Sequence, residues 1–352
     1  MLVAACTSDE PVAVETEIIK SKVEVKMKVG DFLYENVDGT ITVKGFDASN
    51  NERWQKQFEY DGEKENVLEI SGGYHHYSIG FSKWGVADEQ VITLTDLYNE
   101  RADGPQPTIY VLGGEVIPRK LLTTISSMET EGEAGMIPYS KVQYEYNGQG
   151  RVSKMTHFDY NNETKVFQPI RYFNFAYENN RLATIKGYHQ AGDELYITET
   201  YEYYGNGNVS KIIQENINAH TSKVELTYSP NSGEITAVYS NSNGQGFTYQ
   251  FNYLLKNITS DKTTKGGQLC SEGIYTYDKN INPLKHLGYV DFFLANLSVN
   301  NKTVENVSYT ACAFPELEPQ TYQYQYNDDG YPAKVTVNYK GGKKSQIQYT
   351  YE

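Results

Sequence analysis

A short pattern of tyrosine, an Asn-Gly turn and a return segment recurs through the second half of the chain and limits the folds open to it. The clearest copy is VQYEYNGQGRVSKM at 142–155, and looser copies are FAYENNRLATI, YEYYGNGNVSKI, LTYSPNSGEITAV and YQYNDDGYPAKV. The last aromatic residues before three successive turns, Tyr177, Tyr203 and Tyr228, are 26 and 25 residues apart. That period fits one β-hairpin with its connection, so we predict a repeat array from about residue 139.

Each repeat places its aromatic residues on one face of a strand. In TYQYQYNDDGYPAKVTVNY, Tyr322, Tyr324 and Tyr326 are two residues apart and therefore point to the same side. Asn and Gly occupy the turns because they accept positive φ at little cost. Arg151 and Arg181, near the start of return strands, are expected at the solvated rim.

An array of about fourteen strands with one apolar face cannot stay flat and bare; it must twist, curl into an open or closed barrel, or be covered by another layer. We expect an all-β chain in which an N-terminal β-sandwich is followed by antiparallel hairpins forming a long curved sheet or open barrel. The expected divisions are a signal remnant and flexible tether at 1–20, a sandwich at 21–125, a linker at 126–138 and the hairpin repeats at 139–352. The gap of 49 residues from Tyr277 to Tyr326 suggests a degenerate repeat around KTVENVSYT.

Composition narrows the class of partner. The chain has 31 Lys and Arg against 45 Asp and Glu, a formal charge of −14, which argues against nucleic acid and against binding anionic lipid through a basic patch. It also has 32 Tyr, whose apolar ring and polar tip suit half-wet sheet faces. Three cysteines are too few for a disulfide scaffold, and whether Cys270 and Cys312 pair is left open.

The N-terminal LVAAC at 2–6 resembles a bacterial lipobox, in which the cysteine, here Cys6, is lipidated after signal cleavage. The polar and acidic residues that follow, TSDE at 7–10, resemble the surface-export signal of lipoproteins in Bacteroidota. We therefore expect a membrane anchor at Cys6 and a folded part outside the cytoplasm, at the outer membrane or cell surface.

The repeat itself is similar to the tyrosine-aspartate (YD) repeat of RHS-type proteins: Tyr146-Asn147 and Gly150-Arg151-Val152 follow its Tyr-Asp and Gly-Arg-Leu positions, with Asn for Asp. The stretch YTYDKNINPL at 275–284 and the ending YQYNDDGYPAKV look like uncharacterised lipoproteins of gut Bacteroidota, notably the DUF4595 type. The resemblance implies a β-rich repeat fold on a cell-envelope lipoprotein.

No motif for catalysis or for a cofactor stands out: Gly-x-Ser-x-Gly, Walker and dinucleotide fingerprints are not found, so we predict neither an enzyme nor a cofactor. His75 and His76 are adjacent in a strand pattern and would point to opposite faces, which makes a poor metal pair. The segment Asn327–Gly330 is interpreted as a turn rather than a calcium loop. No metal site is predicted.

These observations favour a non-catalytic binding module that contacts a polysaccharide or another envelope protein through aromatic and amide side chains. Trp54 and Trp84 are candidate stacking residues, and both fit the sandwich core equally well. The alternative is a structural or adhesive scaffold with no small-molecule ligand. A cleft lined by exposed rings would favour the binding module, and a scaffold would show no concave pocket.

Overall fold

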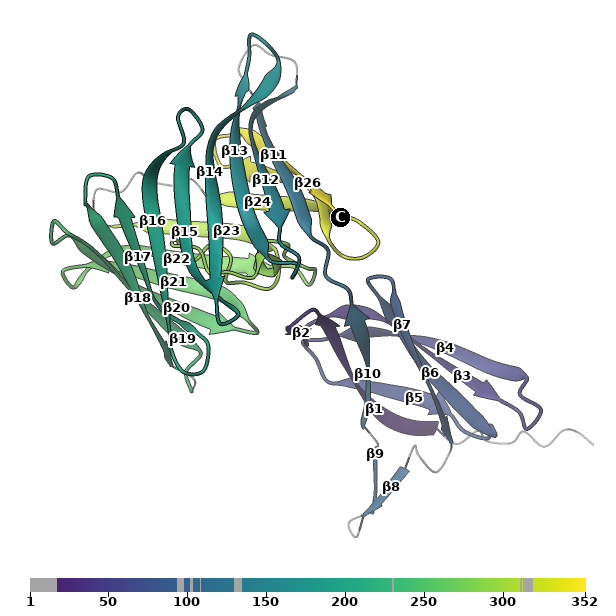
Figure 1. The fold of residues 1–352 in the computed structure, drawn as a ribbon. Helices are drawn as coiled ribbons and strands as arrows, with labels where there is room; N and C mark the ends of the chain where they lie inside the picture. Colours follow the sequence, from purple (N-terminus) through teal and green to yellow (C-terminus); the bar gives the residue numbers. More distant parts are fainter. Residues whose placement is uncertain are drawn as a thin grey trace, which may run out of the picture. The chain divides into compact units, whose positions relative to one another are not determined.

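The computed structural model describes residues 18–93, 98–101, 104–107, 109–129, 135–229, 231–310, 312 and 319–352. The chain divides into two compact units: the first runs to Lys28 and from Glu35 to Glu115, and the second comprises Val29–Tyr34 and Val116–Glu352. Small sheets make up the first unit, and a closed antiparallel barrel makes up the second (Figure 1). The prediction of an all-β chain with N-terminal sheets followed by antiparallel hairpins is confirmed.

The first unit holds two main sheets and one hairpin. One sheet has the order β4-β3-β6-β7, and in the other β1 pairs with both β5 and β10, while β8 and β9 form a separate hairpin. The strands are β1 Ile18–Val29, β3 Asp38–Phe46, β4 Glu52–Asp61, β5 Asn66–Ser71, β6 His76–Lys83, β7 Val86–Thr93, β8 Tyr98–Arg101, β9 Gly104–Pro107 and β10 Ile109–Val116.

Alternation of apolar and polar residues explains the core of this unit. Along β1, every second residue from Ile19 to Val29 is buried, so one face of the strand is dry and the other is wet. Ile41 and Ile79 of the second sheet are also fully buried. The backbone N–H of Val25 donates a 2.9 Å hydrogen bond to the hydroxyl of Tyr60 on β4, which ties the two sheets together.

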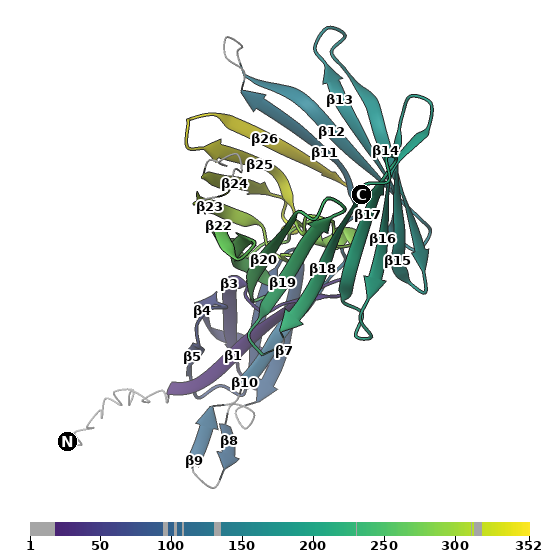
Figure 2. The same cartoon turned by 90° about the vertical axis from the view of Figure 1, so that its left-hand side faces the viewer.

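In the second unit, sixteen strands of described residues, β11 to β26, pair in sequence order, and β11 also pairs with β26 (Figure 2). The barrel is therefore closed rather than open, because the first and last strands satisfy each other's edges. A short strand, β2 Phe32–Tyr34, belongs to the same unit. The barrel strands are β11 Leu121–Glu129, β12 Met136–Tyr146, β13 Val152–Asn161, β14 Val166–Glu178, β15 Arg181–His189, β16 Glu194–Tyr203, β17 Val209–Asn216, β18 Thr221–Ser229, β19 Glu234–Asn241, β20 Gly246–Leu254, β21 Asn257–Lys265, β22 Gln268–Tyr277, β23 Lys302–Tyr309, β24 Gln320–Tyr326, β25 Pro332–Tyr339 and β26 Lys344–Tyr351.

A repeated contact explains why tyrosine and a basic residue recur together. The Tyr177 hydroxyl donates to the carbonyl of Val152 at 2.9 Å, and the guanidinium of Arg151 lies 5.4 Å from the same ring. One hairpin later, the Tyr203 hydroxyl donates to Leu182 at 2.8 Å, with Arg181 5.4 Å from its ring. The two arginines expected at a solvated rim thus also cover a tyrosine ring, which links each hairpin to the next.

The turns use the side chain of asparagine as part of the fold. The Asn147 Oδ1 accepts from the backbone N–H of Gln149 and of Arg151, and the Gly150 N–H donates to the Asn147 carbonyl. Gly150 has a φ of 76°, a conformation that glycine adopts readily because it has no Cβ. The predicted turn at Asn327–Gly330 has the same backbone bonds, as Gly330 donates to Asn327.

Residues 278–301, between β22 and β23, pass through the barrel interior; we call this segment the plug. Its Tyr289 ring packs 5.1 Å from Phe175 on β14, and its Phe292 ring packs 5.6 Å from Tyr239 on β19. A barrel of sixteen strands is too wide for its own side chains to fill, so the plug supplies the missing core. It includes the short 3₁₀ helix η2 Lys285–Leu287.

The plug also accounts for the long gap in the repeat. The expected degenerate repeat around KTVENVSYT does contain a strand, β23, but the rest of the extra length is the plug rather than another hairpin. The disulfide question is answered by the structure, in which Cys270 on β22 and Cys312 are bonded. Because residue 312 follows β23, the bond fastens this position to β22 of the barrel wall.

The domain limits predicted from the sequence stay a prediction. The strands of the structure do not begin and end at those limits. Residues 126–129 and 136–138 of the expected linker lie in β11 and β12, which pair with each other. Cys6 and nearly all of the expected tether at 1–20 lie outside the described residues. Within the described segments, no helix has the length and apolar character needed to cross a bilayer.

Candidate functional site

A cavity of about 1040 Å³ lies at one end of the barrel, where turns of the wall meet the plug. The β16–β17 turn, the β18–β19 turn, β2 and the plug all contribute to its lining. Several lining residues of the two turns are exposed, so the cavity opens to solvent. Its aromatic lining comprises Phe32, Tyr203, Tyr204, Tyr228, Tyr253 and Tyr289.

The rings of this cavity are held in place by their hydroxyl groups. The Tyr204 hydroxyl donates to the Leu226 carbonyl at 2.7 Å, yet the residue remains 42% exposed, so part of its ring is free for contact. Tyr228 packs edge-on against it, with ring centroids 6.3 Å apart. Tyr203 is fixed by the repeated contact to Leu182. Because these rings are already ordered, a ligand that stacks on them loses little conformational entropy of the protein.

The β16–β17 turn adds polar groups beside the rings. Its backbone bonds are made within the turn: the Tyr204 N–H donates to the Asn208 carbonyl at 2.9 Å, and the Gly207 N–H donates back to Tyr204 at 3.0 Å. The Asn206 Oδ1 accepts from the Asn208 N–H at 3.1 Å. The side-chain amide of Asn208 makes no hydrogen bond to another described residue. It is exposed at the mouth of the cavity and can hydrogen-bond a ligand hydroxyl.

The plug contributes a cation to the lining. Lys285 Nζ lies 5.2 Å from the centroid of the Phe32 ring, and burial lowers the pKa of this amine to about 8. No carboxylate of the described residues comes within 4.0 Å of it. Glu234, at the start of β19, is the acidic residue of the lining. Burial raises the pKa of Tyr228 and Tyr253 to about 12, so both remain neutral hydroxyl groups at physiological pH.

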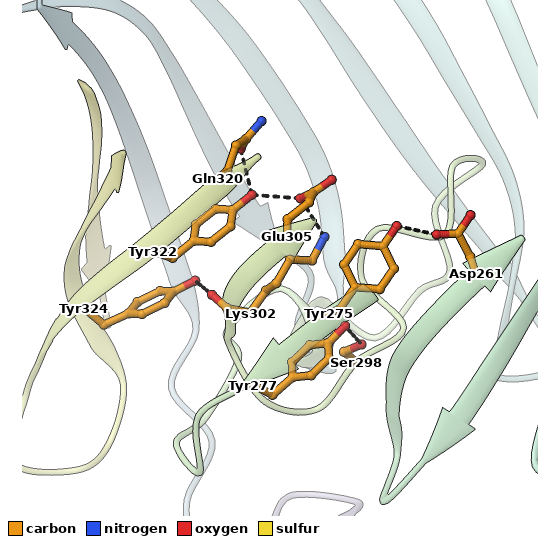
Figure 3. Close-up of polar contacts among 9 residues, drawn as sticks. All are labelled: Asp261, Tyr275, Tyr277, Ser298, Lys302, Glu305, Gln320, Tyr322 and Tyr324. Carbon is orange, nitrogen blue, oxygen red and sulfur yellow. Dashed lines mark hydrogen bonds and ion pairs between the residues drawn. The ribbon is translucent and has the colours of Figure 1, made fainter. Parts of the chain in front are cut away.

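A second polar cluster lies on the inner side of β21–β24 (Figure 3). Lys302 Nζ is 3.0 Å from the Glu305 carboxylate and 4.4 Å from the centroid of the Tyr275 ring. The Tyr322 hydroxyl is 2.9 Å from the same carboxylate. Asp261 accepts from the Tyr275 hydroxyl, and burial raises the pKa of the Asp261 carboxyl.

This cluster contains two carboxylates in different environments, which is a pattern found in acid–base sites. Each carboxylate, however, is already paired: Asp261 with Tyr275, and Glu305 with Lys302 and Tyr322. Buried polar groups that are satisfied in this way stabilise a wide barrel interior. We therefore assign the cluster to the fold rather than to chemistry.

The two predicted stacking residues lie on different strands of the first unit. Trp54 is on β4 and half-buried, with its ring 6.1 Å from that of Tyr74. Trp84 is in the β6–β7 turn and 5% exposed, which favours its role in the core. Gly45 of β3 pairs with Trp54 on one side and with Tyr77 of β6 on the other. Trp84 comes seven residues after Tyr77, so the two tryptophans are separated by roughly 23 Å along the strand direction. They do not form one site, and their role in ligand stacking stays a prediction.

The expectation for the histidine pair is wrong in its geometry. His75 lies in the bend before β6, so strand alternation does not apply, and its Nδ1 is 3.2 Å from the Nδ1 of His76. Within the described residues, no group of three or more His, Cys, Asp or Glu side chains is arranged to hold a metal ion.

Sequence reasoning missed the cavity and the plug residues that line it. The available signal was the doubled tyrosine in YEYYGNGN, where Tyr203 serves the repeat and Tyr204 is the additional ring. The contribution of Lys285 had no such signal, because it depends on the path of the plug inside the barrel.

No protein-family model and no curated protein matches this chain. Among solved structures it is similar to a porin-like protein from Bacteroides uniformis, with 14% identity and a TM-score of 0.45 over 66% of this chain and 98% of that one. A porin-like protein from Bacteroides vulgatus gives 12% identity and a TM-score of 0.37 over 66% and 99%. The Tc holotoxin pore of Photorhabdus luminescens gives 11% and 0.27 over 90% of this chain and 19% of that one. TM-scores below 0.5 carry no inference about function.

Proposed function

We propose that this protein is a non-catalytic binding protein of the bacterial cell envelope and that its ligand is a saccharide held in the ring-lined cavity. The observation that carries the proposal is the cavity itself, with partly exposed, hydroxyl-anchored rings beside the free side-chain amide of Asn208. Sugar rings have apolar faces and polar edges, so they match a site in which aromatic faces and hydrogen-bonding groups alternate.

The size of the cavity also supports this assignment. Sites for small ligands usually occupy about 300–1,000 Å³, and a cavity of about 1040 Å³ lies just above that range. It is suited to several sugar units rather than to one. A cleft lined by rings is expected of a binding module, and a scaffold is expected to lack a concave pocket. The cavity therefore favours the binding module.

The scaffold remains the second candidate because the outer face of β12–β14 carries partly exposed rings. Val142 packs against the barrel core, so its neighbour Lys141 points outward. Lys141 pairs with Phe158 on β13, and its Nζ lies 3.9 Å from the centroid of the Phe158 ring. On the same strands, Tyr160 packs 5.1 Å from Phe167. Such a surface fits contact with another protein.

The location in the envelope is proposed on two grounds. Disulfides such as Cys270–Cys312 form and persist in oxidising compartments, which include the cell envelope. The lipobox-like Cys6 would supply a lipid anchor to the membrane. Outward-facing Lys211 bridges Glu202 at 3.1 Å and Glu225 at 3.8 Å. A barrel in a bilayer needs an apolar outer band about 25 Å tall, so this charged row favours a barrel standing in water. Membership of the YD-like lipoproteins is part of the same proposal, supported by the repeated tyrosine–arginine contact.

A titration of the protein with oligosaccharides chosen from a glycan array tests the function. Replacing Tyr204→Ala removes an exposed cavity ring and should weaken binding about two- to tenfold, whereas Tyr160→Ala on the outer face should leave it unchanged. An array without any bound glycan, or equal losses in the two variants, would count against saccharide binding in this cavity and favour the scaffold.

A further inference from the structure

Three basic residues occupy equivalent places along the barrel rim. Lys120, Arg151 and Arg181 stand at the start of β11, β13 and β15. Each lies over a tyrosine at the end of the next forward strand or one residue before it, at 5.8 Å for Lys120 and 5.4 Å for each arginine. Since neighbouring strands are about 4.8 Å apart, successive members of this basic row are separated by about 10 Å.

The last member of the row reaches the cavity. The ring of Tyr203, over which Arg181 lies, is part of the cavity lining. Arg181 Nη2 is 3.5 Å from the point where Gly207 would carry a Cβ, and Gly207 belongs to the turn that lines the cavity. Arg181 therefore borders the cavity that Lys285 lines, and Arg151 and Lys120 continue the basic row along the rim.

Most of this positive charge is not neutralised by the protein. Lys120 pairs with Glu352 at 3.2 Å, but no carboxylate of the described residues lies within 4.0 Å of Arg151, Arg181 or Lys285. In a chain with a net charge of −14, acidic partners are abundant, as the Lys211, Lys262 and Lys223 pairs on the barrel strands show. Stacking on a ring leaves the N–H donors at the edge of a guanidinium available for an anion.

We propose that the saccharide bound by this protein is an acidic one, a uronate-containing polysaccharide whose carboxylates are bound by Lys285, Arg181 and Arg151. This inference rests on the proposed function, because it names the class of saccharide for the same cavity. Single cations about 10 Å apart, such as Arg151 and Arg181, suit a chain that carries one carboxylate at regular intervals, with a sugar face on the exposed ring of Tyr204. A compact phosphate group would instead need donors that converge on one point.

The test compares galacturonate oligosaccharides with the same oligosaccharides after full methyl esterification. The two ligands share one backbone and differ in charge, so calorimetric titration of the full chain isolates the carboxylate contribution. The acidic form should bind about tenfold more tightly than the ester, and the difference should shrink in high salt.

Variants assign that difference to residues. Lys285→Met keeps the aliphatic stem, and Arg181→Gln keeps a polar side chain; each should lower the affinity for the acidic form about tenfold and leave the affinity for the ester unchanged. Lys186→Gln, an exposed cation on the outer face of β15, is the matched control and should change neither affinity. Circular dichroism before titration confirms that each variant is folded.

The outcomes separate the inference from the proposed function. Equal affinity for the acid and the ester, or a preference that survives in Lys285→Met and Arg181→Gln, overturns the acidic assignment and leaves saccharide binding intact. Binding of neither form, with glycan arrays also blank, overturns the proposed function as well. Preference for a sulfated polysaccharide over the uronate overturns the carboxylate assignment.

Discussion

The two units of this chain differ in how many tyrosines they contain and pack around their cores, although both are built from antiparallel strands. The first unit buries aliphatic side chains such as Ile19, Val43 and Ile79. The second unit holds most of the rings, since only five of the 32 tyrosines, at 60, 74, 77, 98 and 110, fall in the first unit. Its tyrosines pack beside aliphatic residues such as Ile212 and Leu226.

Width explains the difference. Two packed sheets lie about 10 Å apart, a gap that aliphatic side chains fill from both sides. A closed barrel of sixteen strands is wider, so its wall needs side chains that reach further and end in a group that tolerates polar surroundings. Tyrosine meets both needs, and its hydroxyl finds a backbone carbonyl, as Tyr146 does at Leu121. The comparison teaches that residue choice here follows the distance to be filled, and four predictions test it.

The largest effect is expected at the plug. Phe292→Ala should lower the free energy of unfolding of the barrel by about 3–5 kcal/mol, because it empties a buried position inside the lumen. The neighbouring Phe293 is 76% exposed, so Phe293→Ala should change stability by less than about 0.5 kcal/mol. Urea unfolding measures both, and similar values for the two variants would show that the plug is not part of the core.

A substitution in the core of the first unit should destabilise that unit and not the barrel. Ile79→Ala should destabilise the first unit by about 2–5 kcal/mol, since this side chain is fully buried. The unfolding transition of the barrel and the affinity of its cavity should stay unchanged. Calorimetry with two resolved transitions provides the measurement, and a matching shift of the barrel transition would mean that the units are energetically coupled.

High pH should weaken the barrel more than the first unit. Burial raises the pKa of Tyr177, Tyr253 and Tyr277 to about 12, against an ordinary value of 10. Below pH 10 both folded and unfolded states keep these protons, so stability is unaffected; from pH 10 to 12 the unfolded state loses them first, and the free energy of unfolding falls. Thermal scans at pH 8, 10 and 11 check this, and a barrel transition that does not move would contradict it.

The smallest effect concerns one hydroxyl. Tyr177→Phe removes the hydrogen bond to the Val152 carbonyl while keeping the ring under Arg151, and should cost about 0.5–1.5 kcal/mol. Tyr139→Phe on an exposed ring is the control and should cost almost nothing. If Tyr177→Phe were equally harmless, the ring alone would account for the repeated tyrosine.

Much of the fold was predictable because its signals are local. Alternation in QTYQYQY and the Asn-x-x-Gly turns specify strands and hairpins from residues close in sequence. The site was not predictable in the same way: the sequence singles out Trp54 and Trp84 as candidate stacking residues, whereas the cavity rings look like every other tyrosine of the repeat. Tyr204 differs from Tyr203 only in which residues surround it after folding.

The sequence by itself determined that this chain forms paired strands with one aromatic face, since side-chain alternation and turn chemistry act over a few residues. Only the tertiary structure decided that β11 closes onto β26, that residues 278–301 enter the lumen, and that Lys285 meets the rings of the cavity. These contacts join residues far apart in sequence, and their geometry depends on how many strands close the barrel and how much interior is left to fill.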